Sequence, residues 1–156
     1  MQFLRSTILF IHIIAAVVWV GGILFLAMIV PYARHLNLPN SSPTLRAIGL
    51  RFRDISWLAV VVLLITGIGN LYFLNAFDNL FRFLAAHSVL IWKLIFVALM
   101  IGTKAAHDFF IGPRAGKIEP HIGFKSRWWQ AARILGNANV AFALIVFYLA
   151  MLLVTG

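Results

Sequence analysis

Residues 85–116 read AAHSVLIWKLIFVALMIGTKAAHDFFIGPRAG, and this stretch decides how the rest of the chain is interpreted. It is apolar over most of its length, and no proline interrupts it before Pro113. At about 1.5 Å per residue, a helix over residues 84–111 is long enough to cross the roughly 30 Å hydrocarbon core of a bilayer. The stretch therefore predicts a membrane-spanning helix.

Three ionisable side chains interrupt this apolar helix. Lys104 and His107 follow Lys93 by 11 and 14 residues, close to whole numbers of helical turns, so all three project from one face with Met100 between them. We expect Lys93 near the middle of the membrane, where exposing an ammonium to lipid costs at least about 2.5–3.5 kcal/mol. Lys93 is therefore a candidate catalytic residue, carboxylate-binding residue or proton relay. Lys104 is expected to snorkel toward the headgroups.

Composition excludes several classes of protein. The chain is 63% hydrophobic and only 11% charged, with a mean hydropathy of +0.98, which excludes an ordinary soluble domain of 156 residues. It contains no cysteine, which excludes disulfides, thiolate zinc sites, iron–sulfur clusters and cysteine nucleophiles, and leaves histidine as the only strong nitrogen donor for a metal. The net charge of +9 comes from basic loops and indicates topology rather than nucleic acid binding.

The same reasoning predicts the architecture of the whole chain. We expect an all-α integral membrane protein, a single domain over residues 1–156 built as a four-transmembrane-helix bundle. The first span ends at Pro31 and is too long and too interrupted for a cleaved signal peptide, so we expect it to be retained. Residues 44–53 are expected to form a short interfacial helix before the second span. The four predicted helices cover about 7–30, 55–73, 84–111 and 131–154.

The distribution of lysine and arginine predicts the orientation. The two long loops and their flanks hold nine basic residues, whereas Arg5 and Arg82 alone lie on the other side. Both termini are therefore expected outside and both long loops in the cytoplasm of a bacterium, with the chain in the inner membrane. The nine are Arg34, Arg46, Arg51, Arg53, Arg114, Lys117, Lys125, Arg127 and Arg133.

With this orientation the histidines gather at two depths. His12 and His87 are expected near the outer ends of their helices, and His107, His35 and the loop residue His121 toward the inner side. Two imidazoles at one level on neighbouring helices are what axial ligation of a b-type haem requires. The candidate metal ligands are thus His12, His87, His107 and His35. The plainer alternative is that each imidazole hydrogen-bonds a neighbouring helix or is exposed to water near a membrane surface.

Short motifs carry a resemblance to a known family. His12, Trp19 and Gly22 in the first span, followed by Arg51-Phe52, resemble the copper resistance protein D family of bacterial inner-membrane proteins. The third span also fits small members of that family, because it carries Trp92-Lys93-Leu94, His107-Asp108-Phe109 and Gly112-Pro113-Arg114.

The His12, Trp19 and Gly22 pattern, together with Lys93, also resembles the HemJ-type protoporphyrinogen oxidases, which are membrane proteins that bind a b-type haem. This resemblance implies His12 as a haem ligand and Lys93 as a residue essential for activity. Trp19 and Gly22 are candidate cofactor contacts, although an aromatic packing residue and a close helix contact are the plainer interpretations.

Three classes of function remain. We favour a haem b redox protein, acting in electron transfer or porphyrinogen oxidation, with a quinone, a porphyrinogen or an electron-transfer protein as candidate partners beside the bilayer. Copper transport is the alternative, although Cu(I) prefers thiolate and thioether ligands and the chain has only four methionines. The third is a small structural subunit of a larger membrane complex or oligomer. No catalytic triad, phosphate loop or zinc signature favours another enzyme class.

Overall fold

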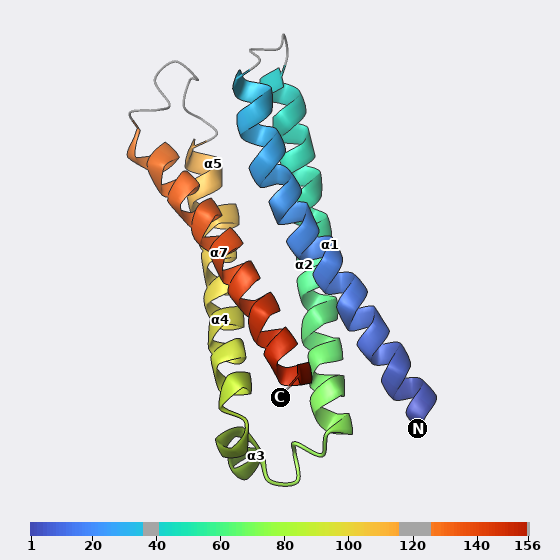
Figure 1. The fold of residues 1–156 in the computed structure, drawn as a ribbon. Helices are drawn as coiled ribbons and strands as arrows, with labels where there is room; N and C mark the ends of the chain where they lie inside the picture. The colour runs from blue at the N-terminus through green and yellow to red at the C-terminus, as the bar shows by residue number, and fades with distance from the viewer. Residues whose placement is uncertain (36–40, 116–125, 156) are drawn as a thin grey trace. The chain divides into compact units, whose positions relative to one another are not determined.

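A computed structural model describes residues 1–35, 41–115 and 126–155, and in these ranges it shows helices and no strand (Figure 1). Four of the helical segments are long and apolar enough to cross a membrane. The all-α fold with four candidate spanning helices is therefore confirmed. The spans are Gln2–Tyr32, Pro43–Phe73, Ser88–Ala115 and Arg127–Leu153.

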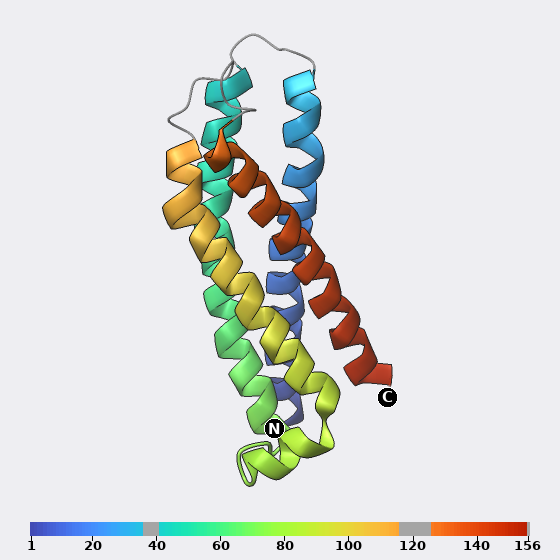
Figure 2. The ribbon, with the colours of Figure 1, turned by 90° about the vertical axis from the view of Figure 1, so that its left-hand side faces the viewer.

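The chain divides into two compact units, residues 1–87 and residues 88–156. The first contains α1 (Gln2–His35), α2 (Ser41–Phe73) and the short α3 (Leu80–Ala86). The second contains α4 (Ser88–Ala105), the π-helix η1 (Ala106–Ile111), α5 (Gly112–Ala115) and α7 (Arg127–Thr155). Each unit places two long helices side by side, as Figures 1 and 2 show from two directions.

In the first unit, α1 and α2 run antiparallel and pack along much of their length. Small residues set how closely they approach. A Cβ atom added to Gly22 would overlap the ring of Phe52, and one added to Gly69 would lie 3.2 Å from Ile8 Cγ2. Gly22 therefore makes room for an aromatic ring of the neighbouring helix, which supports the close-contact interpretation of this glycine.

Two helices in this unit are longer than the sequence pattern predicts. Pro31 lies inside α1, because the helix continues for one further turn to His35 despite the missing N–H of the proline. Residues 44–53 are the first part of α2 and do not form a separate interfacial helix. Asp54 consequently lies in the middle of α2, where it accepts hydrogen bonds from the Arg53 guanidinium at 3.2 Å.

In the second unit, a buried polar contact and an aromatic pair join α4 to α7. Asn139 is 8% exposed, and its Nδ2 donates to the carbonyl oxygen of Met100 at 2.9 Å and to Thr103 Oγ1 at 3.2 Å. Phe96 and Phe142 lie with their ring centroids 5.9 Å apart. The amide thus satisfies its donors across the helix pair, as the absence of water in a hydrocarbon environment demands.

The third predicted helix is not continuous over 84–111. The chain leaves α3 after Ala86, His87 adopts non-helical backbone angles, and α4 begins at Ser88. Lys93 is therefore five residues from the start of its helix, or about 7.5 Å along the axis. The mid-membrane expectation counted nine residues from residue 84, and that count is wrong, because the helix begins at Ser88 and Lys93 lies in the first third of the span Ser88–Ala115.

The two adjacent glycines of α1 provide a matched test of its packing. Replacing Gly22 by Ala should lower the free energy of unfolding by about 1–3 kcal/mol, because the methyl group must displace the Phe52 ring. Gly21→Ala, whose Cβ meets nothing within 4 Å, should instead leave stability unchanged or raise it by up to about 1 kcal/mol. Thermal unfolding in detergent measures both, and equal effects would contradict the packing described for Gly22.

A second matched pair tests the contact between α4 and α7. Asn139→Leu removes both donated hydrogen bonds and should cost about 0.5–2 kcal/mol, the range found for polar contacts between membrane helices. Asn137→Leu, at an exposed position two residues earlier, serves as the control and should change stability little. Chemical denaturation in detergent compares the two. A larger loss for Asn137→Leu would show that the polar contact of α7 is elsewhere.

Candidate functional site

His12 is held from across the α1–α2 interface by Thr66. The imidazole Nδ1 and Thr66 Oγ1 lie 2.8 Å apart, and the hydroxyl is 2.6 Å from the carbonyl oxygen of Val62, one turn earlier in α2. Thr66 is only 8% exposed, so its hydroxyl is buried between the helices. The ring of His12 also faces Gly67, where an added Cβ would lie 3.6 Å from its Cε1.

The number of hydrogens at Thr66 fixes the tautomer of His12. The hydroxyl carries one hydrogen, which it donates to the Val62 carbonyl, since that oxygen can only accept. At His12 the threonine oxygen must therefore accept, and Nδ1 donates. Neutral His12 consequently carries its ring lone pair on Nε2. Metal-binding histidines in proteins commonly have this arrangement, in which the second ring nitrogen donates to a polar partner.

Trp19 and Gly22 continue the face of α1 that carries His12. Trp19 follows His12 by two turns, is 3% exposed, and places its indole Nε1 where no described group accepts its hydrogen. Gly22 comes three residues later, and its free space is filled by the Phe52 ring. The three residues of the first-span motif thus differ in their surroundings. His12 has a polar partner, Trp19 carries a buried N–H donor of its own, and Gly22 makes room for packing.

His87 is held by its own helix rather than by α1 or α2. It follows α3, its Nδ1 donates to the Phe83 carbonyl oxygen at 2.8 Å, and its ring stacks on Phe83 at a centroid distance of 4.3 Å. The ring is exposed and lines an open pocket of about 260 Å³ together with Asp78 and Arg82. His35 is the last residue of α1, and its side chain, like the whole of His121, lies outside the described residues.

The second unit contains a buried ionic cluster of Lys104, Asp108 and His107. Lys104 Nζ donates to Asp108 Oδ2 at 2.6 Å, and His107 Nδ1 lies 3.1 Å from Asp108 Oδ1. The exposed fractions of the side chains are 7% for Lys104 and 11% for Asp108, against 39% for His107. Lys104 therefore does not snorkel as the sequence suggested, because a carboxylate one turn later neutralises it inside the unit.

A short π-helix determines where His107 lies. In η1 the Gly112 N–H donates to the His107 carbonyl oxygen, five residues back, and a Cβ on Gly112 would lie 2.9 Å from that oxygen. Only glycine accommodates so close an approach without a shift. Just beyond η1, the Arg114 guanidinium donates to the Phe110 carbonyl at 2.6 Å and lies 5.2 Å from the ring centroid of Trp128. Single π-helical turns are frequent at functional sites.

Lys93 does not share the environment of Lys104. Met100 and Lys104 are buried on α4, whereas Lys93 is half-buried and makes no hydrogen bond or ion pair with any residue that the structure describes. The predicted common face thus holds for Met100 and Lys104, and Lys93 presents an ammonium without a described partner.

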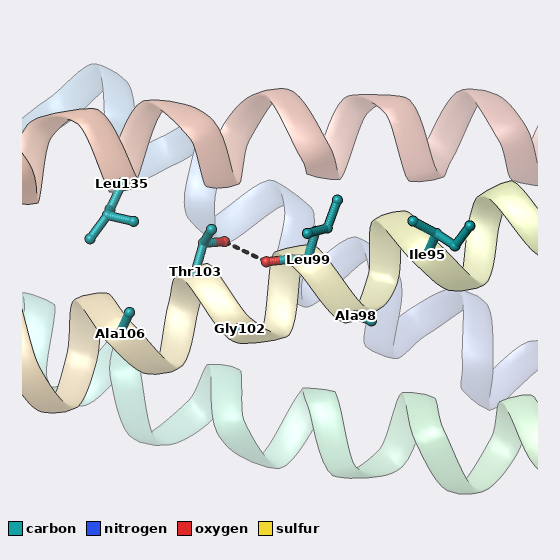
Figure 3. A pocket seen from close by; sticks show the side chains of 7 residues that line it. All are labelled: Ile95, Ala98, Leu99, Gly102, Thr103, Ala106 and Leu135. Atoms are coloured by element: carbon teal, nitrogen blue, oxygen red, sulfur yellow. Dashed lines mark hydrogen bonds between the residues drawn. The ribbon is translucent and has the colours of Figure 1, made fainter.

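One pocket of the second unit is separate from these polar groups. It is an open, mainly apolar groove of about 510 Å³ along α4, lined by Ala98, Gly102 and Ala106 with Leu135 from α7 (Figure 3). Its one hydroxyl, on Thr103, donates to the Leu99 carbonyl at 2.9 Å, as the dashed line shows. Neither Lys104 nor His107 lines this groove, so it is not the polar site.

Each of the two units contains an oriented imidazole, but neither contains a complete set of metal ligands among the described residues. Among the described residues, no group of three or more His, Cys, Asp or Glu side chains gathers closely enough to hold a metal ion. His12 and His107 nevertheless share one arrangement, with Nδ1 engaged by an oxygen and the lone pair of the neutral ring on Nε2. Each can contribute one nitrogen ligand or accept one hydrogen bond.

Two partners of these histidines were not predicted as site residues. Thr66 was not singled out from the sequence, and Asp108 was named only as part of the family motif. The sequence did hold a signal for Asp108, because it follows Lys104 by four residues and opposite charges at this spacing face each other on a helix. No comparable local signal joins His12 to Thr66, which are 54 residues apart.

The buried pair makes a testable prediction about stability. Asp108→Asn leaves the Lys104 ammonium without its counter-charge and should lower the free energy of unfolding by about 3–5 kcal/mol. Adding Lys104→Met removes the stranded charge and should restore most of that loss. Denaturation in detergent of the two single variants and the double variant gives the coupling energy, and strictly additive losses would show that the pair is not coupled.

Comparison with known proteins identifies relatives over most of the chain. The family model for copper resistance protein D matches residues 46–156. An uncharacterised protein of Aquifex aeolicus is 30% identical over 154 residues, covering 96% of this chain and 94% of that protein. No solved structure matches.

The match to the family covers more than half of the chain, and it agrees with the motifs of the third span and with the four apolar helices. The chain is thus an integral membrane protein linked by its family to copper resistance, and it belongs to the copper resistance protein D family of the bacterial inner membrane.

Proposed function

We propose that the protein binds copper ions as cargo and takes part in copper homeostasis at the inner membrane, with His12 as a ligand. The observation that carries this proposal is the hydrogen bond from His12 Nδ1 to Thr66, which directs the ring lone pair to Nε2. The choice of copper as the metal rests on family membership, because the family is linked to copper resistance.

The chemistry of the donors suits this cargo. Imidazole nitrogen binds copper well, and in a chain without cysteine it is the strongest ligand available. The thioether of Met100, 2% exposed within the second unit, is a softer donor that suits Cu(I). Because the described residues hold no group of three or more His, Cys, Asp or Glu side chains, the proposal assigns a single firm protein ligand and transient binding.

The experiment measures copper binding to the purified protein in detergent, by elemental analysis after equilibration and by electron paramagnetic resonance of Cu(II). His12→Ala should lose the bound ion. Thr66→Val keeps the shape of the residue but removes the acceptor for Nδ1–H, and should weaken binding about 10- to 100-fold. Thr66→Ser restores the hydroxyl and should restore the affinity.

His87→Ala is the matched control, because it also removes an imidazole, but one held by α3 alone. It should retain the copper that His12→Ala loses. If His12→Ala binds as much copper as the unaltered protein, the assignment of His12 is wrong. If the unaltered protein binds no copper either, the proposal as a whole is wrong.

A b-type haem is the second candidate, favoured by two donors, one in each unit, that have no acceptor among the described residues. Besides His12, the indole N–H of Trp19 is buried without a described acceptor, and the Lys93 ammonium has no described partner. Carboxylates, such as haem propionates, would accept from either group. When bound, the haem would supply one-electron redox chemistry, in electron transfer or porphyrinogen oxidation. His12 and His87 in the first unit and His107 in the second would each be candidate ligands.

A visible spectrum separates the two candidates. A Soret band that shifts on reduction, and that is lost in His12→Ala, supports haem, whereas copper without a Soret band supports the cargo proposal. Replacing Lys93 by Met should shift the haem potential or lower haem retention if its ammonium meets a propionate. A normal spectrum and potential in that variant would remove Lys93 from the haem site.

A further inference from the structure

The first part of α2 carries two arginines that no acidic residue in the described ranges neutralises. Arg46 and Arg51 are exposed, and neither forms a hydrogen bond or an ion pair with a residue that the structure describes. Arg53 differs, because its guanidinium is held by Asp54 at 3.2 Å, with exposed side-chain fractions of 37% and 66%. The segment from Ser41 to Asp54 therefore presents two cations without a partner in the described part of the chain and one paired cation.

The length of α2 places these arginines at a definite depth. The helix has 33 residues, about 50 Å at 1.5 Å per residue, which is well beyond the roughly 30 Å of the hydrocarbon core. Twenty residues span that core, and counting back from Phe73, where α2 ends before a polar turn, reaches Arg53. A tilt of about 20° adds only about one residue.

Arg53 thus lies at the edge of the hydrocarbon, and the other two arginines lie farther out. Arg51 is about 3 Å beyond Arg53 along the helix axis, inside the headgroup layer, which is roughly 5–8 Å thick on each side. The backbone of Arg46, about 10 Å beyond Arg53, lies just outside that layer, and its long side chain can reach back to the phosphates. The C-terminal end of α1 lies beside the N-terminal end of α2, which carries these arginines (Figures 1 and 2).

The surface around the arginines also suits a phospholipid. Arg46, Gly49 and Arg53 follow each other at three- and four-residue spacing and so share one flank of α2, whereas Arg51 projects about 140° away from Arg46 and would meet a different phosphate group. Gly49 leaves that flank open, since a Cβ there would meet nothing within 4 Å. Leu50 and Ile55 are 44% and 53% exposed, and their apolar side chains can lie against acyl chains.

We propose that Arg46 and Arg51, with Gly49 between them in the chain, bind the phosphate groups of anionic phospholipids at the membrane surface. This goes beyond the proposed copper function and does not depend on it, because none of these residues contacts His12 or Thr66. Arginine suits the task, because its planar guanidinium offers paired donors that match phosphate oxygens. Asp54 limits the site by holding the third guanidinium.

The test measures lipid binding to the whole protein in detergent, by native mass spectrometry of lipid adducts and by the rise in melting temperature on adding lipid. Phosphatidylglycerol should bind better than phosphatidylcholine, and added salt should reduce the difference. Arg46→Gln with Arg51→Gln should weaken phosphatidylglycerol binding about 25-fold, or about fivefold for each arginine. Arg46→Lys with Arg51→Lys should retain much of it.

Two further variants make the outcome decisive. Asp54→Asn releases the Arg53 guanidinium and should strengthen phosphatidylglycerol binding, which a merely structural role of Asp54 would not produce. Arg5→Gln with Arg82→Gln removes the same charge from two other exposed positions and should weaken binding less. Equal binding of the two lipids, an undiminished affinity after Arg46→Gln with Arg51→Gln, or weaker binding in Asp54→Asn would each overturn the proposal.

Discussion

The constraint on which this structure depends is that a polar group inside a bilayer must find its partner within the protein, because hydrocarbon offers none. Thr66 illustrates how one buried group can satisfy two others. Its single hydroxyl donates to the Val62 carbonyl of its own helix and at the same time accepts from His12 of the opposing helix. The packing of α1 on α2 and the orientation of the candidate ligand are therefore one arrangement, and neither can change without the other.

The same constraint explains the second unit. Asp108 uses one carboxylate oxygen for Lys104 and the other for His107, so three ionisable groups are accommodated with little exposed charge. Asn139 likewise directs its amide to a main-chain carbonyl and to a hydroxyl of α4. These polar contacts fix the relation of neighbouring helices more specifically than apolar packing does, since lipid tails compete with apolar side chains but not with hydrogen-bond partners.

Hydropathy predicted the number and type of the long helices but not where they end. Apolar runs report which residues tolerate lipid, and they do not report that α1 continues through Pro31 or that His87 interrupts the chain before α4. The break at His87 places Lys93 five residues from the start of α4, and the predicted interfacial segment is a continuous part of α2. Where a helix ends depends on the hydrogen bonds of a few backbone groups. Hydropathy, which is averaged over many residues, does not report them.

The candidate site was predictable only in part, for a related reason. His12 was identifiable from its isolation in an apolar helix, and the family motif named it as well, although the family match itself begins at residue 46. Its partner Thr66 was not identifiable, because a contact between residues far apart in the chain leaves no periodic signal. Lys104 was misjudged because the cost of burying it was weighed alone, without the carboxylate four residues later.

The π-helix η1 has one consequence for how this span should be aligned with its relatives. A π-turn accommodates one residue more than an α-turn of the same rise, so η1 is equivalent to a single-residue insertion after Ala105. Each residue beyond it is rotated by about 100° relative to an uninterrupted helix. The offset brings Arg114 over Trp128, and an ungapped alignment with a relative lacking the extra residue would assign every later position to the wrong side of the helix.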